Sequence, residues 1–186
     1  MSEERDGVDL VEMVVESVRV HMLSSQHVVI LKELDRDRYL PIWIGPWEAN
    51  AIAMRLQGLS PERPLTHDTF ATTLDELGIE IRRIVIADLA DETFHARMYL
   101  WSDGREVEID SRPSDALALA VRANVRIFAA PAVLSKAGVE PERAGDELEV
   151  TGEHMADERL DVFRDFVNSL DVDLGGERRE GPGSES

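Results

Sequence analysis

The sequence predicts an α+β fold made of two β-β-β-α units that share a mostly antiparallel sheet, with extra helices near the C-terminal end. Three observations lead to this prediction. Segments rich in Val and Ile alternate with turn residues, which is typical of strands. Alanine-rich segments carry apolar residues at the spacing i, i+3, i+4, i+7, which indicates helices. The sequence also matches itself at an offset of 67 positions, which indicates a duplication.

The first unit contains three expected strands and a helix. Residues 11–22 and 27–34 are rich in Val and Ile and flank a short polar stretch, a pattern that predicts a hairpin. A third strand is expected over residues 39–44. A helix should then start near Pro46 and end before Gly58, because Pro is favoured in the first turn and Gly after the last. Its apolar stripe would comprise Ala49, Ile52, Ala53 and Leu56.

The second unit follows a loop and repeats this order of elements. Residues 66–68, Thr-His-Asp, are expected to open a helix that ends at Gly78. The next segments are predicted as three strands over residues 79–87, 94–101 and 106–110, a helix beginning at Pro113, a strand over residues 126–130 and a short helix over residues 131–137. Asp103-Gly104 supplies the turn between the last two strands of the unit.

The duplication is visible when residues 46–55, PWEANAIAMR, are aligned with residues 113–122, PSDALALAVR. Five of the ten positions are identical and two more are conservative, which is more than two alanine-rich helices share by chance. The alignment places Glu48 and Asp115 in equivalent first turns of equivalent helices. We therefore expect the two carboxylates to lie near a pseudo-twofold axis.

The composition limits both the chemistry and the location. The chain of 186 residues is near the size of one domain, and it contains no cysteine, which excludes disulfides, zinc-thiolate sites and thiol nucleophiles. A net charge of −18 counts against a simple DNA-binding module, because phosphate contacts normally draw on clustered Lys and Arg. The acidic N-terminus is unlike a signal peptide, and no apolar run is long enough to span a bilayer. We expect a cytoplasmic protein without a membrane partner.

Three regions are expected along the chain. Residues 1–140 would form the folded domain, residues 141–170 an acidic loop and an amphipathic helix, and residues 171–186 a disordered tail. The amphipathic helix should pack on the core or on a partner. It would do so through one apolar side, which comprises Leu160, Phe163, Phe166, Val167 and Leu170.

The stretch Arg-Pro-Ser-Asp stands directly before the alanine-rich run of the second unit and has two interpretations. As a helix start it needs no function, since Ser111 or Ser114 can cap free N–H groups and Asp115 favours the positive end of the helix dipole. Arg112 is not explained in this way. An Arg beside the free N–H groups of a helix forms an anion site, for a phosphate or for a neighbouring carboxylate.

The stretch Thr66-His67-Asp68 also has two interpretations. Thr66 or Asp68 can cap the helix, with His67 as a surface residue of its first turn. Alternatively, His67 is a general base or metal ligand and Asp68 a second oxygen ligand. Together with Glu48 and Asp115, such carboxylates could hold Mg²⁺ or Mn²⁺, which prefer oxygen ligands.

Four stretches resemble the bifunctional nuclease domain family, in this order: LPIWIGPWEANAIA (40–53), RPLTHD (63–68), LGIEI (77–81) and RPSDALALA (112–120). The resemblance covers about residues 10–140. It implies an α+β domain, often oligomeric, with nuclease activity toward both DNA and RNA in some members. It marks the motif residues as candidates: Glu48, Thr66, His67, Asp68, Arg112, Ser114 and Asp115.

The first hypothesis is a metal-assisted nuclease that acts on DNA or RNA. The resemblance also implies that the protein is a homo-oligomer. The catalytic residues would be His67, Asp68, Arg112 and Asp115, the substrate-binding residues Arg112, Ser114 and Thr66, and the ligands of Mg²⁺ or Mn²⁺ Glu48, Asp68 and Asp115. His67 would activate water, and Arg112 would stabilise the charge that develops on the phosphate.

The second hypothesis is a non-catalytic oligomerisation or regulatory module, in which the Arg-Asp motifs are internal ion pairs and caps. In that case Arg112→Ala costs about 3 to 5 kcal/mol if it strips a buried partner. An Arg112 side chain that is fully paired to buried carboxylates would favour this hypothesis. Candidate side chains that gather around one opening to water would favour the first.

Overall fold

The computed structural model describes residues 9–20 and 26–140. They belong to the first of two units into which the chain divides, Met1–Glu140 and Pro141–Ser186. The strands of the described part are β1 Val11–Val20, β2 His27–Glu33, β3 Tyr39–Ile44, β4 Glu80–Ala90, β5 Thr93–Ser102, β6 Arg105–Ser111 and β7 Arg126–Ala129. Its helices are α1 Pro46–Leu56, α2 Thr66–Glu76, α3 Pro113–Ala123 and α4 Pro131–Ala137. The amphipathic helix and tail expected within residues 141–186 lie outside the described residues.

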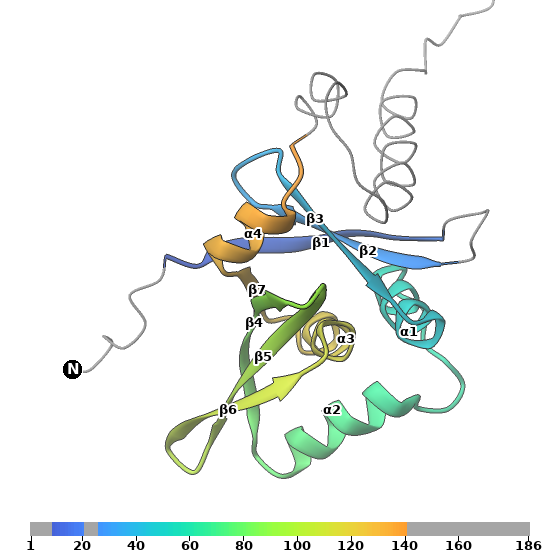
Figure 1. Cartoon of the computed structure of the whole chain (residues 1–186). Coiled ribbons are helices and arrows are strands. Elements are labelled where there is room, and N and C mark those ends of the chain that lie inside the picture. Colours follow the sequence, from blue (N-terminus) through green and yellow to red (C-terminus); the bar gives the residue numbers. More distant parts are fainter. Residues whose placement is uncertain (1–8, 21–25, 141–186) are drawn as a thin grey trace, which may run out of the picture. The chain divides into compact units, whose positions relative to one another are not determined.

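The strands form one sheet in the order β3-β2-β1-β7-β4-β5-β6 (Figure 1). Neighbouring strands are antiparallel except β4 and β7, which run parallel. The predicted α+β fold with a mostly antiparallel sheet is therefore confirmed. Strands β1 to β3 and β4 to β6 each form a three-stranded meander, and β7 joins the two meanders by pairing with β1 and with β4.

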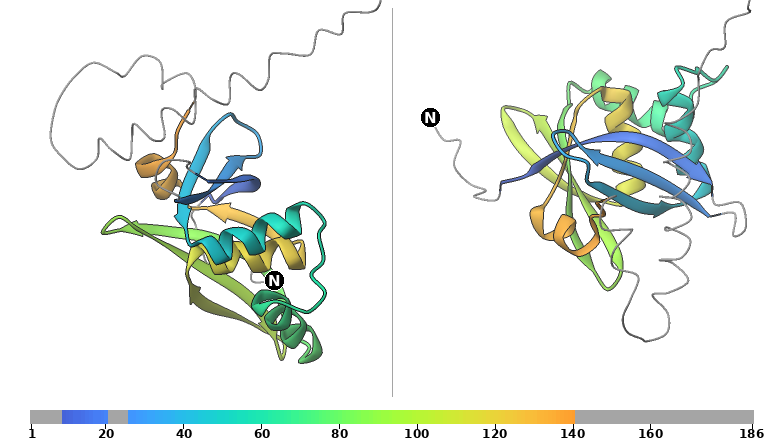
Figure 2. Two further views of the ribbon diagram at one scale, coloured as in Figure 1. Left: turned by 90° about the vertical axis from the view of Figure 1, so that its right-hand side faces the viewer. Right: turned by 90° about the horizontal axis from the view of Figure 1, so that it is seen from above.

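The helices α1 and α3 pack side by side against the sheet (Figure 2). Helix α1 contacts β1 and β2, whereas α3 contacts β4, β5 and β7. The small alanine side chains of the two helices let them approach each other and the sheet closely. The buried alanines of the two helices are Ala49, Ala51, Ala116, Ala118 and Ala120. On the sheet, β4 and β5 contribute Ile84, Ile86, Ala96 and Met98.

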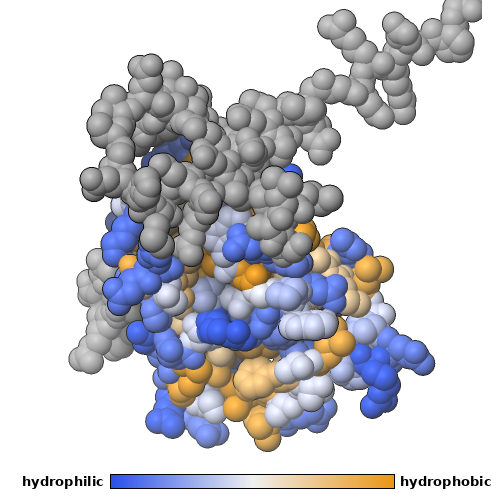
Figure 3. All heavy atoms as spheres, turned by 45° about the vertical axis from the view of Figure 1, so that its right-hand side comes forward, coloured by the Kyte–Doolittle hydropathy of each residue, from blue (hydrophilic) through white to orange (hydrophobic). Residues whose placement is uncertain are grey.

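Several large apolar side chains in and after α1 and α2 are exposed in this single chain. Trp47, in the first turn of α1, is 82% exposed and so lies outside the core. Hydrophobic atoms reach the surface in separate places among hydrophilic ones (Figure 3). The other exposed residues in this region are Leu56, Leu59, Phe70 and Leu77.

The order β-β-β-α occurs twice, and α1 and α3 both begin at the predicted prolines. An order of elements does not measure whether two units superpose, so the internal duplication stays a prediction. In the part of the chain that the structure describes, no helix is both long enough and apolar enough to cross a bilayer.

Candidate functional site

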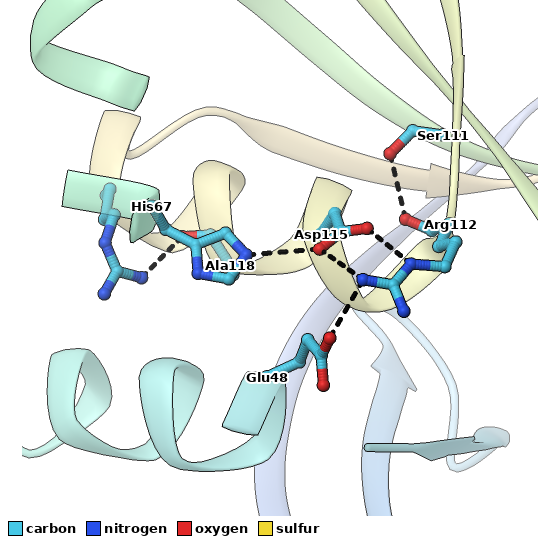
Figure 4. A network of polar contacts seen from close by, with 7 residues as sticks. Glu48, His67, Ser111, Arg112, Asp115 and Ala118 are labelled. Carbon is cyan, nitrogen blue, oxygen red and sulfur yellow. Dashed lines mark hydrogen bonds and ion pairs between the residues drawn. The ribbon is translucent and has the colours of Figure 1, made fainter. Parts of the chain in front are cut away.

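The N-terminal ends of α1 and α3 lie next to each other, and Arg112 joins them (Figure 4). Arg112 directly precedes α3, and its Nη2 donates a hydrogen bond to Oε1 of Glu48 in the first turn of α1 at 2.9 Å. Near the other end of the same helices, Nε of Arg55 donates to the carbonyl oxygen of Val121 at 3.4 Å. The two helices therefore run in the same direction, and the positive ends of both helix dipoles face the same region.

Arg112 binds Asp115 with a fork of two hydrogen bonds. Its Nε donates to Oδ2 at 2.7 Å and its Nη2 donates to Oδ1 at 3.1 Å. Together with the bond to Glu48, these contacts use the three N–H groups on Nε and Nη2. No described residue accepts a hydrogen bond from Nη1, and the side chain is 68% exposed. Two guanidinium N–H groups thus remain for an anion from solvent.

His67 reaches the same carboxylate from the first turn of α2. Its Nε2 lies 3.3 Å from Oδ1 of Asp115 (Figure 4). An ionised carboxylate can only accept, so a neutral imidazole must carry its proton on Nε2 to make this bond. The other ring nitrogen, Nδ1, is then an acceptor, and no described residue donates a hydrogen bond to it. Asp115 therefore favours the tautomer in which Nδ1 can take up a proton.

Asp68 does not join these contacts, although it follows His67 directly in the chain. Its Oδ1 accepts a hydrogen bond from Nε of Arg122 at 2.6 Å, and its Oδ2 accepts one from the backbone N–H of Leu65 at 2.9 Å. The second bond confirms that Asp68 caps the start of α2. Arg122 also donates from Nη1 to the carbonyl oxygen of Ala118 at 2.8 Å, and its side chain is only 7% exposed.

The sequence motifs did not identify Arg122 as a site residue. The available signal was the repeat, in which Arg122 and Arg55 are the last aligned positions. In the structure Arg55 of α1 donates to the carbonyl oxygen of Val121 in α3, whereas Arg122 of α3 donates to that of Ala118 within the same helix.

The cations lower the pKa values of both aspartates. Burial raises the pKa of Asp115, but hydrogen bonds from Arg112 and His67 outweigh burial and the net shift is downward. Burial also raises the pKa of Asp68, and hydrogen bonds from a backbone N–H group and Arg122 outweigh it. The pKa of Arg112 is raised, chiefly by its hydrogen bond to Asp115. These contacts therefore stabilise the ionised forms of all three side chains.

Glu48 folds back over Gly45, the residue that directly precedes α1. A Cβ atom built at position 45 would lie 2.4 Å from Oε2 of Glu48, which is too close for atoms that are not bonded. The absence of a side chain at Gly45 therefore leaves room for the Glu48 carboxylate to cover the helix end and reach Arg112.

The remaining candidates lie apart from the Arg112 contacts. Thr66 is the first residue of α2 and is exposed, whereas Ser114 lies in the first turn of α3 and is buried. The prediction that Ser111 or Ser114 caps α3 is wrong, because the cap residue is Arg112 and no side chain in the described part of the chain caps the helix with a hydrogen bond. Ser111 donates instead to the carbonyl oxygen of Arg112 at 3.0 Å. The structure brings together Glu48, His67, Arg112 and Asp115.

The residues predicted to bind a metal do not form one ligand group. Among residues 9–20 and 26–140, no three His, Asp or Glu side chains lie together in a way that could hold a metal ion. The guanidinium of Arg112 contacts both Glu48 and Asp115. Asp68 is bound to Arg122 instead. A divalent ion would compete with these cations for the same oxygens, so the residues as arranged do not fit Mg²⁺ or Mn²⁺.

Comparison with known proteins places the chain in a family. A family model described as the bifunctional nuclease domain matches residues 29–142. Uncharacterized proteins of two Mycobacterium tuberculosis strains, CDC 1551 and H37Rv, are 38% identical over 162 residues, which is 87% of this chain and 96% of each of those proteins. Bifunctional nuclease 1 of Oryza sativa subsp. japonica is 27% identical over 129 residues, which is 66% of this chain and 39% of the rice protein. The family match spans more than half of the sequence and both helix starts described above, so the chain belongs to the bifunctional nuclease domain family.

Proposed function

We propose that this chain is a nuclease that cleaves DNA or RNA at the Arg112 cluster, which consists of Glu48, His67, Arg112 and Asp115. The observation that carries the proposal is the position of Asp115, whose carboxylate binds the Arg112 guanidinium and the His67 ring at once. A cation that suits phosphate and a ring that can accept a proton are thereby held together. The rice relative, which is named a bifunctional nuclease, supports the same activity.

Hydrolysis of a phosphodiester needs a base for the attacking water and donors for the charge on the phosphate oxygens. In the proposed reaction, Nδ1 of His67 takes a proton from water while the water oxygen forms a bond to phosphorus. Asp115 stabilises the imidazolium that results. The Nη1 N–H groups of Arg112 bind the non-bridging oxygens. The bond from phosphorus to one sugar oxygen then breaks, that oxygen takes up a proton from solvent, and the His67 imidazolium releases its proton to solvent.

The exposure of the cluster agrees with a cation that faces the phosphate. The Arg112 side chain is 68% exposed, whereas that of Glu48 is 16% exposed. The guanidinium is therefore the outermost charge of the cluster, and a phosphate that approaches from solvent meets it before the carboxylates. The two parallel helix ends add positive potential in the same region, about half an elementary charge each.

Metal use, assembly and location are separate from the proposed reaction. No step above uses Mg²⁺ or Mn²⁺, and the metal therefore stays a prediction from the sequence. The exposed Trp47 supports a homo-oligomer, because a second copy could remove its large apolar side chain from water. The lack of cysteine is compatible with the cytoplasm.

The test is cleavage of single-stranded DNA and RNA by the wild type and by Asp115→Asn, purified identically. The substitution keeps the shape of the side chain and removes the charge that holds Arg112 and His67. Loss of base catalysis should reduce cleavage by about 100-fold or more. Parallel assays with EDTA, Mg²⁺ and Mn²⁺ show whether an ion takes part. Equal cleavage by the two proteins would reject the proposal, since the activity would then come from another site or a contaminant.

A second candidate function is that of an interaction module without catalysis. The observation that favours it is that Arg112 already pairs with Glu48 and Asp115 and so ties α1 to α3. The exposure of Arg112 counts against it, because exposed ion pairs contribute little to stability. A folded wild type that cleaves nothing under any of the conditions above would favour this candidate.

A further inference from the structure

Among the ion pairs of the described residues near the Arg112 cluster, the contact between Arg122 and Asp68 is the least exposed. Arg122 lies in the last turn of α3, and its side chain is 7% exposed. Its Nε binds Asp68 at 2.6 Å, and its Nη1 binds the carbonyl oxygen of Ala118 at 2.8 Å. These two bonds fix the guanidinium against its own helix and direct one edge of it toward α2. The pair therefore links the first turn of α2 to α3.

Asp68 transmits this link to the backbone of α2. While Oδ1 binds Arg122, Oδ2 accepts from the N–H of Leu65, the residue directly before the helix. Each oxygen of the Asp68 carboxylate therefore accepts one hydrogen bond, Oδ1 from α3 and Oδ2 from the backbone at the start of α2. His67 lies between Leu65 and Asp68 in the chain, so its backbone is held by the same contacts.

The hydrogen bond between His67 and Asp115 depends on this placement of α2, and a small shift of the helix would break it. His67 Nε2 lies 3.3 Å from Asp115, just beyond the usual N–H···O range of about 2.7 to 3.2 Å. A shift of α2 away from α3 by about 1 Å, less than the 1.5 Å rise of one helical residue, would break it. By comparison, Arg112 would keep its two bonds to Asp115, because both residues belong to the start of α3.

We propose that Arg122 and Asp68 are positioning residues that hold the first turn of α2 on α3 and thereby keep the His67 ring on Asp115. Their catalytic consequence rests on the proposed nuclease function, whereas their effect on the ring does not. Asp68 then acts through His67 and touches neither the substrate nor a metal ion. Arg122 becomes part of the site although no described contact joins it to the Arg112 cluster directly.

Asp68→Asn is the sharpest variant, because Asn can still accept from the Leu65 N–H but no longer attracts Arg122 by charge. Arg122→Lys is the complementary variant on the other side of the ion pair, since Lys keeps the charge but cannot bind Asp68 and Ala118 with one rigid fork. Nitrogen-15 chemical shifts of the His67 ring report which nitrogen carries the proton. We expect the preference for the Nε2–H tautomer to weaken in both variants. We also expect kcat to fall by about 10- to 100-fold while KM changes little.

Glu33→Gln is the matched control. Glu33 is buried and binds Arg38 at 2.7 Å, so it forms a comparable ion pair on β2, away from α2 and α3. It should lower stability without changing the His67 ring shifts or kcat. A purely structural role for Asp68 would make the two variants behave alike, which would overturn the proposal.

Two further outcomes separate the proposals. If the wild type does not cleave nucleic acid, the nuclease function fails, but the ring shifts of Asp68→Asn still decide the positioning role. If kcat falls in Asp68→Asn while the ring shifts match those of the wild type, Asp68 acts directly in the reaction and the positioning role is overturned. Because Asp68→Asn retains the helix cap, we expect it to fold even if Arg122→Lys does not.

Discussion

Substitution of Arg112 separates the catalytic proposal from the structural one. The catalytic proposal predicts a large loss of cleavage and a small loss of stability, whereas the structural one predicts a large loss of stability and unchanged cleavage. Arg112→Ala removes one hydrogen bond to Glu48 and two to Asp115. The side chain is 68% exposed, and exposed ion pairs contribute about 0 to 1 kcal/mol each. With two pairs lost, the free energy of unfolding should fall by at most about 2 kcal/mol.

The expected loss of cleavage is larger than the loss of stability. Removing one donor that stabilises transition-state charge reduces kcat by about 100- to 1000-fold, which corresponds to about 2.7 to 4 kcal/mol. Arg112→Lys keeps the charge but loses the fork, so it cannot bind Asp115 with two bonds and also offer a pair of N–H groups to phosphate. We expect Arg112→Lys to lower kcat as well, by a smaller factor than Arg112→Ala.

Urea unfolding and the rate of cleavage at saturating single-stranded DNA are the two measurements. Arg97→Ala is a matched control, because Arg97 also contacts two carboxylates, Glu108 and Asp110, on the neighbouring strand β6. It should change stability by a similar amount and leave kcat unchanged. A loss of about 3 to 5 kcal/mol in Arg112→Ala with unchanged kcat would refute the catalytic reasoning, since breaking a buried structural pair has that effect.

Three other predictions follow from the same contacts. Gly45→Ala should displace the Glu48 carboxylate, because the new Cβ would lie 2.4 Å from its Oε2. We expect kcat to fall by less than in Arg112→Ala. The free energy of unfolding, measured with urea, should change by no more than about 1 kcal/mol. Folding lowers the pKa values of Asp68 and Asp115 from 3.8. The stability that the two ionised carboxylates contribute is therefore present above pH 3.8 and is lost as the pH falls below it. Asp115→Asn should lose less stability between neutral pH and about pH 3 than the wild type. Above about 0.1 M salt, binding of single-stranded DNA measured by fluorescence anisotropy should give a slope of log K against log salt of about −0.7 to −1.4, as expected for one or two phosphate contacts; a slope steeper than about −3 would require a basic surface elsewhere.

Most of the fold could be predicted because each element carries a local signal. The turn between β5 and β6 uses Asp103 and Gly104, both of which have positive φ, and the sequence pair identified it. The turn between β4 and β5 has positive φ at Asp91 and Glu92, which are not residues that signal such a turn strongly. The strand predicted over residues 79–87 therefore ended too early, since β4 ends at Ala90, and the strand predicted over residues 94–101 began one residue too late, since β5 begins at Thr93. The central place of β7 could not be predicted, because pairing with β1 and β4 is a long-range property.

The candidate site divides in the same way between local and long-range features. Arg112 and Asp115 are three residues apart at a helix start, so their contact follows from local geometry. The approach of Glu48 to this pair agrees with the aligned repeat. The link between Arg122 and Asp68 joins residues 54 positions apart, and it depends on how α2 packs on α3. A pattern of nearby residues cannot show such packing, which is why the sequence could not pair Asp68 with Arg122.

The charge of the chain determines how the proposed binding should depend on salt. Residues 141–186 contain 14 acidic residues and five arginines, so they account for half of the net charge of −18. At about 0.01 M salt the Debye length is about 30 Å, and this negative charge should repel a nucleic acid over long range. At about 0.1 M it falls to about 10 Å, and the local contact with Arg112 then decides binding. Affinity should therefore rise with salt at first and fall only above about 0.1 M, the opposite of a protein that binds nucleic acid through a broad basic surface.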